Sequence, residues 1–167
     1  VGVGQSETTV SNLADFFLLL MLAGAGDELQ GIKRGIMELA DALIITKSDG
    51  DNSINAKNAA MEYKRALHLF PDKENGWIPQ VSTCSALDKT GLDTIWDLIE
   101  KYNNQMQANS YFMNNRNKQN NYWLHHTIKH ELGIKKYQQL IAGNSLTDLE
   151  QDIKKGSSIY EVLKKIA

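Results

Sequence analysis

Short apolar segments alternate with helical patterns up to residue 102, and this alternation constrains the fold more than any other feature of the sequence. Three segments have the length and composition of strands: 16–22, 42–45 and 78–82. Apolar residues at helical spacing predict helices around 8–14, 29–39, 51–70 and 92–102. Strands that are joined through helices pair in parallel. We therefore predict an α/β fold, a partial doubly wound parallel sheet with helices on both faces.

The tetrapeptide Thr46-Lys47-Ser48-Asp49 follows the apolar segment 42–45 directly. The Asp49 carboxylate offers two acceptor oxygens, which can take the ring N–H and the exocyclic amine of guanine together, a pair that adenine cannot form. The aliphatic stem of Lys47 can lie along the purine face. The segment resembles the guanine-reading loop of G proteins, although Thr46 stands where such loops usually carry Asn.

Two further segments resemble G-protein motifs. Ser85-Ala86-Leu87 follows the predicted strand 78–82, and the small Ala86 would let backbone N–H groups approach the guanine carbonyl oxygen. Segment 1–7 resembles the switch that contacts the terminal phosphate, where the Gly2 backbone N–H can face an anion. Gly2 and Gln5 are therefore candidate catalytic residues. Small GTPases often carry a water-orienting Gln directly after this glycine, so Val3 at that position predicts slow intrinsic hydrolysis.

The segment 24–35, Gly-Ala-Gly-Asp-Glu-Leu-Gln-Gly-Ile-Lys-Arg-Gly, narrows the family. With segments 1–7 and 16–22, it resembles the MeaB/ArgK family of P-loop GTPases from residue 1 to about 98. This resemblance implies a GTPase that uses GTP/GDP and Mg²⁺ and acts as a chaperone of the adenosylcobalamin enzyme methylmalonyl-CoA mutase. From the composition, we expect the chain to be cytoplasmic. Older descriptions name the family transport-system kinases.

In that family, the loop matching residues 24–33 relays the nucleotide state to the mutase. The resemblance therefore implies that Asp27, Gln30 and Lys33 couple the chain to its partner. Their spacing of three places them on one side of a helix start, where Asp27 is suited to cap the helix. A capped helix with a solvated charged face is the alternative interpretation.

No Gly-x-x-x-x-Gly-Lys-Ser/Thr segment occurs in the 167 residues, so the loop and the lysine that bind phosphates are missing. We interpret the sequence as the C-terminal part of a G protein, with most Mg²⁺ ligands outside this chain, and expect the chain alone not to turn over GTP. The alternatives are a non-catalytic interaction or dimerisation module, or an ATPase like a transport-system kinase.

Composition argues against several partner classes. The net charge of −2 and the pI near 6.1 give no electrostatic reason to expect nucleic acid or anionic membrane. The seven-residue apolar segment 16–22 is too short to span a bilayer. Cys84 is the only cysteine and is interpreted as a packed thiol rather than a nucleophile.

After Tyr102 the sequence becomes rich in Asn and Gln up to residue 121 and then continues with helical patterns. Aromatic and Met residues interrupt this tract, which favours a long polar helix over a disordered linker. We assign residues 1–105 to the GTPase domain and 106–167 to a helical arm. His126 and His130 lie four apart on a predicted helix, near His125, but without an acidic or thiol partner, and we predict no metal site there.

The C-terminal arm carries two predicted capping boxes, Thr147-x-x-Glu150 and Ser158-x-x-Glu161. Each precedes or overlaps an apolar stripe, and the stripes comprise Leu146, Leu149 and Ile153 and then Ile159, Val162, Leu163 and Ile166. Such short helices are unstable alone and must dock on another surface, either the G domain or a second copy of the chain. The family resemblance implies a dimerisation arm, so we expect a homodimer in which these stripes pack on the partner's helices.

Overall fold

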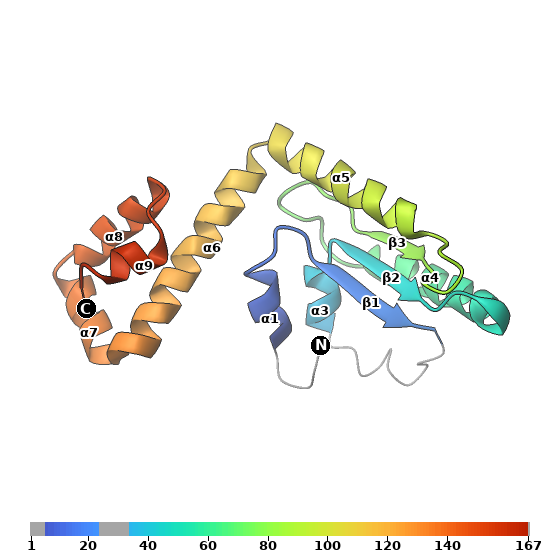
Figure 1. Ribbon diagram of the computed structural model, residues 1–167, viewed down its shortest axis with the longest axis horizontal. Coiled ribbons are helices and arrows are strands. Elements are labelled where there is room, and N and C mark those ends of the chain that lie inside the picture. Colours follow the sequence, from blue (N-terminus) through green and yellow to red (C-terminus); the bar gives the residue numbers. More distant parts are fainter. Residues whose placement is uncertain (1–5, 24–33, 167) are drawn as a thin grey trace. The chain divides into compact units, whose positions relative to one another are not determined.

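The computed structural model describes residues 6–23 and 34–166, and the chain divides into two compact units, Val1–Asn109 and Ser110–Ala167. The predicted boundary between residues 105 and 106 falls inside a helix of the first unit. The described strands of that unit are β1 (Leu18–Leu22), β2 (Ala42–Thr46) and β3 (Gln80–Thr83). Its described helices are α1 (Ser6–Ser11), α3 (Arg34–Leu39), the 3₁₀ turn η1 (Gly50–Asn52), α4 (Ser53–Leu67) and α5 (Leu92–Ala108) (Figure 1).

Within the described residues, the strands form one parallel sheet in the order β1-β2-β3. Leu19 pairs with Leu43, which in turn pairs with Val81, so the apolar residues of neighbouring strands share a face. On this face, the β-strand residues pack with α3 and α4 in a cluster of buried residues that includes Leu19, Met37, Leu43, Ile45, Ala56 and Tyr63. The predicted α/β fold with a parallel sheet is confirmed.

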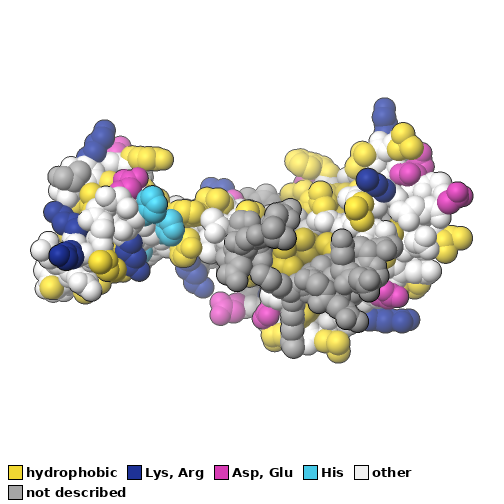
Figure 2. Space-filling view, turned by 90° about the horizontal axis from the view of Figure 1, so that it is seen from below, with side chains coloured by type: hydrophobic (Ala, Val, Ile, Leu, Met, Phe, Trp, Pro, Cys, Tyr) yellow, Lys and Arg dark blue, Asp and Glu magenta, His cyan; other side chains and the backbone are white. Residues whose placement is uncertain are grey.

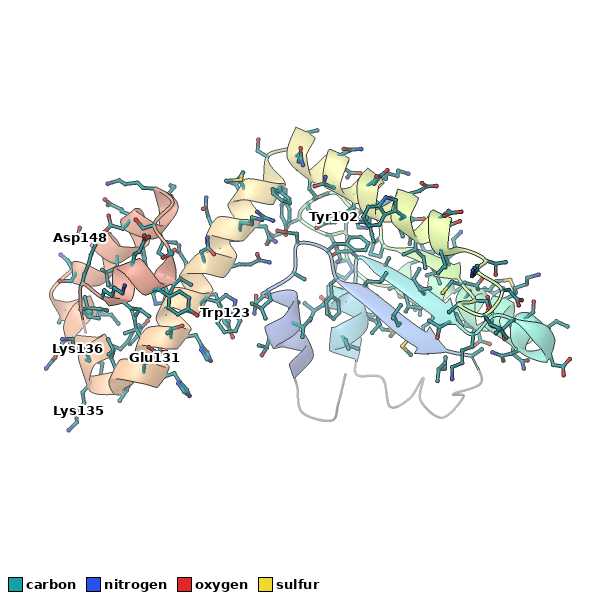
Figure 3. The ribbon with its side chains drawn as sticks, in the orientation of Figure 1. Tyr102, Trp123, Glu131, Lys135, Lys136 and Asp148 are labelled. Atoms are coloured by element: carbon teal, nitrogen blue, oxygen red, sulfur yellow. The ribbon has the colours of Figure 1, made fainter. Side chains whose placement is uncertain are left out.

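Helix α5 carries the residue that anchors it to the unit. Tyr102 is 4% exposed and points inward from α5 (Figure 3). Its ring makes edge-to-face contacts with Phe16 and Trp77, at centroid distances of 4.9 and 5.1 Å. By contrast, Leu20 and Leu22 of β1 are 58% and 47% exposed, so the described residues leave part of the sheet uncovered.

A buried carboxylate fastens the amino ends of the strands. Asp41 Oδ2 accepts a hydrogen bond of 2.8 Å from the Phe17 backbone N–H, and Asp41 Oδ1 forms a 2.7 Å ion pair with Lys73 Nζ. The Asp41 carbonyl accepts a further bond of 2.8 Å from Trp77 Nε1. Because these partners precede β1 and β3, they fix the edge of the sheet at which the strands begin. The loops that follow β2 and β3 lie at the opposite edge.

The second unit consists of helices packed on their own core. Its elements are α6 (Tyr111–Thr127), the π-helical turn η2 (Ile128–Leu132), α7 (Gly133–Ala142), α8 (Ser145–Lys154) and α9 (Ile159–Leu163). The core lies between these elements and comprises Leu124, Ile128, Leu140, Leu146, Leu149, Ile153, Val162 and Leu163. The expectation that the C-terminal stripes pack on a partner's helices is therefore wrong, because most of their residues are buried within the chain and Ile159 and Ile166 pack against the same core, partly buried. The homodimer itself stays a prediction.

Of three sequence-based expectations for the helices, the structure confirms one and corrects two. The predicted single helix through the Asn/Gln-rich tract is two helices, α5 and α6, separated at Ser110, whose φ is 61°. The Ser158 capping box is confirmed, because Ser158 Oγ accepts from the Glu161 N–H at 3.2 Å and Glu161 Oε2 accepts from the Ser158 N–H at 2.8 Å. The Thr147 box is wrong: α8 begins at Ser145, so Thr147 lies inside the helix.

Smaller differences affect the first unit. Strand β1 begins at Leu18 rather than at residue 16. Strand β3 begins at Gln80, two residues after its predicted start at residue 78. The predicted helix 51–70 begins as a 3₁₀ turn and ends at Leu67, ahead of Pro71. None of the described helices has the length and apolar character needed to cross a membrane.

Candidate functional site

The two predicted guanine-contacting loops meet at the carboxyl ends of β2 and β3. Segment 46–49 leaves β2 and segment 85–87 follows β3, and parallel strands end at the same edge of a sheet. Backbone hydrogen bonds continue beyond the strands, because the Cys84 N–H donates to the Ile45 carbonyl at 2.9 Å and the Ser48 N–H donates to the Cys84 carbonyl at 3.0 Å. The loops are therefore held side by side by the backbone.

Ser85 connects the two loops through its side chain. It is completely buried, and its hydroxyl donates a hydrogen bond to Asp49 Oδ2 and accepts one of 3.0 Å from the Asp88 N–H. Each carboxylate oxygen has more than one acceptor position, so this bond fixes the Asp49 carboxylate and leaves it able to accept further donors. The half-buried Asp49 thus combines a fixed orientation with free acceptor capacity.

Lys47 and Thr46 adopt specific conformations in the first loop. Lys47 has an exposed side chain and a φ of 55°, in the left-handed region that non-glycine residues rarely adopt. Its carbonyl accepts a hydrogen bond of 2.7 Å from Asn52 Nδ2. Thr46, which stands in place of the usual Asn, donates from its hydroxyl to the Met21 carbonyl at 3.0 Å and so connects this loop to the end of β1.

The second loop is closed by its own antiparallel bridge. Ser85 and Thr90 exchange backbone hydrogen bonds of 3.0 and 3.1 Å, and Ala86 and Leu87 lie exposed between them. The chain then turns into α5 at Gly91, whose φ is 75°. A Cβ atom at Gly91 would lie 2.4 Å from the Thr83 carbonyl oxygen, so only glycine fits between this turn and the end of β3.

Sequence reasoning missed two residues that shape the loops, Asn52 and Gly91. Glycine directly before a helical pattern was a visible signal for a turn. From the sequence, Asn52 indicates only the start of a helix. Its hydrogen bond to Lys47 was not predictable, because it depends on a loop conformation that the sequence does not reveal. Five predicted site residues lie outside the described residues, and their roles stay predictions: Gly2, Gln5, Asp27, Gln30 and Lys33.

Cys84 lies beneath the two loops and does not take part in their polar contacts through its side chain. It is 6% exposed, and burial raises the pKa of its thiol above the ordinary value. A raised pKa keeps the thiol protonated near neutral pH and unreactive. Cys84 therefore serves as a buried packing residue next to the two loops.

The histidines of the second unit are engaged with other side chains. His125 contacts the Tyr137 hydroxyl and Glu150 Oε1, both at 2.8 Å, and the His126 and His130 rings stack with centroids 6.2 Å apart. Histidine side chains are visible at the surface of this unit in Figure 2. Across residues 6–23 and 34–166, no group of three or more His, Cys, Asp or Glu side chains could hold a metal ion.

The first unit also contains a small cavity far from the loops, at the amino-end side of the sheet. Its volume is about 80 Å³, and its lining includes Met37, Phe70, Lys73 and Trp77. Ligand sites for small molecules usually enclose about 300–1,000 Å³. This cavity is too small for a nucleotide.

Comparison with known proteins agrees with the loop geometry. Residues 1–140 match the family described as methylmalonyl Co-A mutase-associated GTPase MeaB. The chain is 45% identical over 132 residues to GTPase ArgK of Escherichia coli, covering 79% of this chain and 40% of that protein. It is 42% identical over 129 residues to the mitochondrial methylmalonic aciduria type A homolog of Mus musculus, covering 77% of this chain and 31% of that protein.

A solved structure shares the fold of this chain. The crystal structure of a LAO/AO transport system kinase superposes with a TM-score of 0.71 at 35% identity, over 99% of this chain and 53% of the other. The chain thus spans about 40% of the ArgK length and about half of the solved kinase chain. Given the match over residues 1–140 and the joined loops at the edge of a parallel sheet, the chain belongs to the MeaB family of methylmalonyl Co-A mutase-associated GTPases.

Proposed function

We propose that this chain carries the guanine-recognition part of a GTP-binding, GTP-hydrolysing chaperone for an adenosylcobalamin-dependent mutase of the methylmalonyl-CoA mutase type. One observation supports guanine binding most strongly: the hydrogen bond from Ser85 to Asp49, which joins the two loops and orients the carboxylate. The family match and the names of the relatives support the choice of mutase.

In this proposal, the roles divide between base contact and loop support. Asp49 accepts the ring N–H and the exocyclic amine of guanine, and the Lys47 stem covers the purine face. Backbone N–H groups of Ala86 and Leu87 face the guanine carbonyl oxygen. Thr46 and Ser85 contact the loops rather than the base, through the bonds to Met21 and Asp49.

The remaining roles fall on residues outside the described part of the chain. Gly2 and Gln5 are proposed to act near the terminal phosphate, while Asp27, Gln30 and Lys33 are proposed to couple nucleotide state to the mutase. Mg²⁺, which neutralises charge on the phosphates, would be held mostly by residues that this chain does not contain. Because the sequence has no phosphate-binding glycine–lysine loop, residues 1–167 alone are expected not to turn over GTP.

The decisive test is a change of base specificity. Asp49→Asn in the gene product that carries these residues should weaken GDP binding by roughly 2–4 kcal/mol, because charge-assisted hydrogen bonds are lost. The Asn amide can donate to the carbonyl that xanthine carries in place of the guanine amine. Xanthosine diphosphate should therefore bind the variant better than it binds the unchanged protein, as measured by calorimetric titration.

Asp51→Asn is the matched control. Asp51 is exposed and lies two residues after Asp49, and its substitution removes the same charge. Its GDP affinity should stay within a factor of two or so of the unchanged protein. Equal GDP affinity in the Asp49 and Asp51 variants would overturn the assignment of Asp49. Binding of ADP as tight as GDP would favour the ATPase alternative, and absence of nucleotide binding would favour a non-catalytic interaction module.

A further inference from the structure

Asn52 occupies a position at which its side chain would ordinarily serve the following helix. It ends the turn η1 and immediately precedes α4, and Asn is among the strongest N-cap residues because its side-chain oxygen can accept from the first free N–H groups of a helix. In this structure the Asn52 side chain makes no capping hydrogen bond. Its amide turns back to the preceding loop instead.

The acceptor of that amide is the carbonyl of Lys47, at 2.7 Å. Lys47 has a φ of 55°, a conformation that costs an ordinary residue about 1–2 kcal/mol and persists only where surrounding contacts impose it. The Asn52 backbone N–H also donates to the Asp49 carbonyl at 3.1 Å. Asn52 therefore closes the segment between Lys47 and Asp49 with one side-chain bond and one backbone bond.

The three residues at the tip of this loop are each held by a different partner. Ser48 is bonded to the Cys84 carbonyl, and Asp49 is bonded to the buried Ser85. Lys47 is bonded to Asn52. Ser85 thus controls the carboxylate that selects guanine, whereas Asn52 controls the backbone that carries the Lys47 stem.

We propose that Asn52 is a positioning residue for purine binding, which holds Lys47 in the left-handed conformation that lays its stem against the base. This inference rests on the proposed guanine site. It predicts a division of labour: Asp49 and Ser85 determine which purine binds, and Asn52 with Lys47 determines how tightly any purine is held.

The sharpest variant is Asn52→Asp, which keeps the size and the helix-start preference of the side chain but removes the amide donors. Its Kd should rise about five- to tenfold for GDP and by the same factor for inosine diphosphate, whose base lacks the exocyclic amine. Asp49→Asn should instead weaken GDP more than inosine diphosphate. Calorimetric titration of both nucleotides with both variants measures these ratios.

Two control variants and one stability measurement separate positioning of Lys47 from general stability. Asn55→Asp introduces the same charge on an exposed residue in the first turn of α4 and should leave both Kd values nearly unchanged. In a Lys47→Ala background, Asn52→Asp should add little further loss, because the stem it positions is gone. The melting temperature of Asn52→Asp should stay close to that of the unchanged protein, since Asp also suits a helix start.

The outcomes are distinguishable. If Asp49→Asn changes specificity as expected and Asn52→Asp leaves both Kd values unchanged, the inference about Asn52 is overturned while the guanine site stands. The same holds if Asn52→Asp and Lys47→Ala losses are additive, which would mean that Asn52 acts independently of the Lys47 stem. If Asp49→Asn has no effect on GDP, the proposed function fails first.

Discussion

The two units bury their apolar residues by different means and carry opposite charge. Unit Val1–Asn109 packs helices on a parallel sheet and has fifteen acidic and nine basic residues, whereas unit Ser110–Ala167 packs short helices on one another and has five acidic and nine basic residues. The site loops belong to the sheet, whose strand ends converge. The candidate nucleotide-binding residues therefore lie together at the sheet edge. The helical unit instead carries a net positive charge, and residues such as Lys135 and Lys136 lie on its surface (Figure 3).

The largest effect should come from the core of the helical unit. Leu124 is completely buried there, and Leu124→Ala should cost about 2–5 kcal/mol through lost burial and the cavity that remains. Hydrogen exchange measured by mass spectrometry should show faster exchange across residues 110–166, with the sheet of the first unit unchanged. Ile134→Ala, at a 57% exposed position of the same unit, is the control and should change little.

Equal acceleration of exchange in β2 and in α8 would break the comparison, because it would mean that the two units unfold together.

The same experiment tests the double change Ile159→Asp and Leu163→Asp. Leu163 is only 9% exposed in the intrachain core, so we expect this pair to unfold the helical unit.

An intermediate effect should come from the turn that precedes α5. Gly91→Ala places a Cβ atom 2.4 Å from the Thr83 carbonyl oxygen at a φ of 75° and must displace the backbone beside the Ser85 loop. Gly76 has a similar φ of 69° with open space around it, so Gly76→Ala carries only the conformational cost of about 1–2 kcal/mol. Urea unfolding should show a greater loss for Gly91→Ala, and equal losses would contradict the close packing of the site edge.

The smallest effect concerns the cap of α9. Ser158→Ala removes the hydroxyl that accepts from the Glu161 N–H, at a cost of about 1 kcal/mol to the helical unit. In the unchanged protein, hydrogen bonds from the Ser158 backbone and then from its side chain lower the pKa of Glu161 below its ordinary value. Since the folded pKa is depressed, this stabilisation is present above the unfolded pKa and is lost as pH falls through the folded pKa.

NMR titration of the Glu161 carboxylate measures that cap directly. The pKa of Glu161 should rise toward its ordinary value in Ser158→Ala, and the acid sensitivity of α9 should decrease accordingly. An unchanged pKa would show that the backbone bond alone maintains the depression.

The sequence predicted the parallel sheet and the meeting of the loops because both follow from local patterns. Asp49 and Ser85 lie in the loops that follow two strand patterns, and the ends of parallel strands lie at the same edge of a sheet. The contact between Lys47 and Asn52 was not predictable, since it depends on a left-handed backbone at a lysine, which residue type argues against. Local rules thus predicted the edge but not the conformation of its loop.

In the helical unit, periodicity identified the buried residues but not what covers them. Leu146, Leu149 and Ile153 were expected against a partner and instead meet Leu124 and Ile128 of the same unit. A helical stripe of apolar residues indicates that one face of the helix is buried. The pattern is the same whether the surface that covers this face belongs to the same chain or to a partner chain. The Thr147 box failed because α8 begins two residues earlier, at Ser145, with Asn144 at the N-cap position.

The uncovered side of β1 has a consequence for handling the chain in solution. Leu20 and Leu22 are exposed on a strand that, among the described residues, pairs with β2 alone. An edge strand with free backbone donors and acceptors and exposed leucines templates association with other strands. Association between copies of the chain should therefore begin at residues 18–22, and Leu20→Lys should raise the yield of dispersed protein.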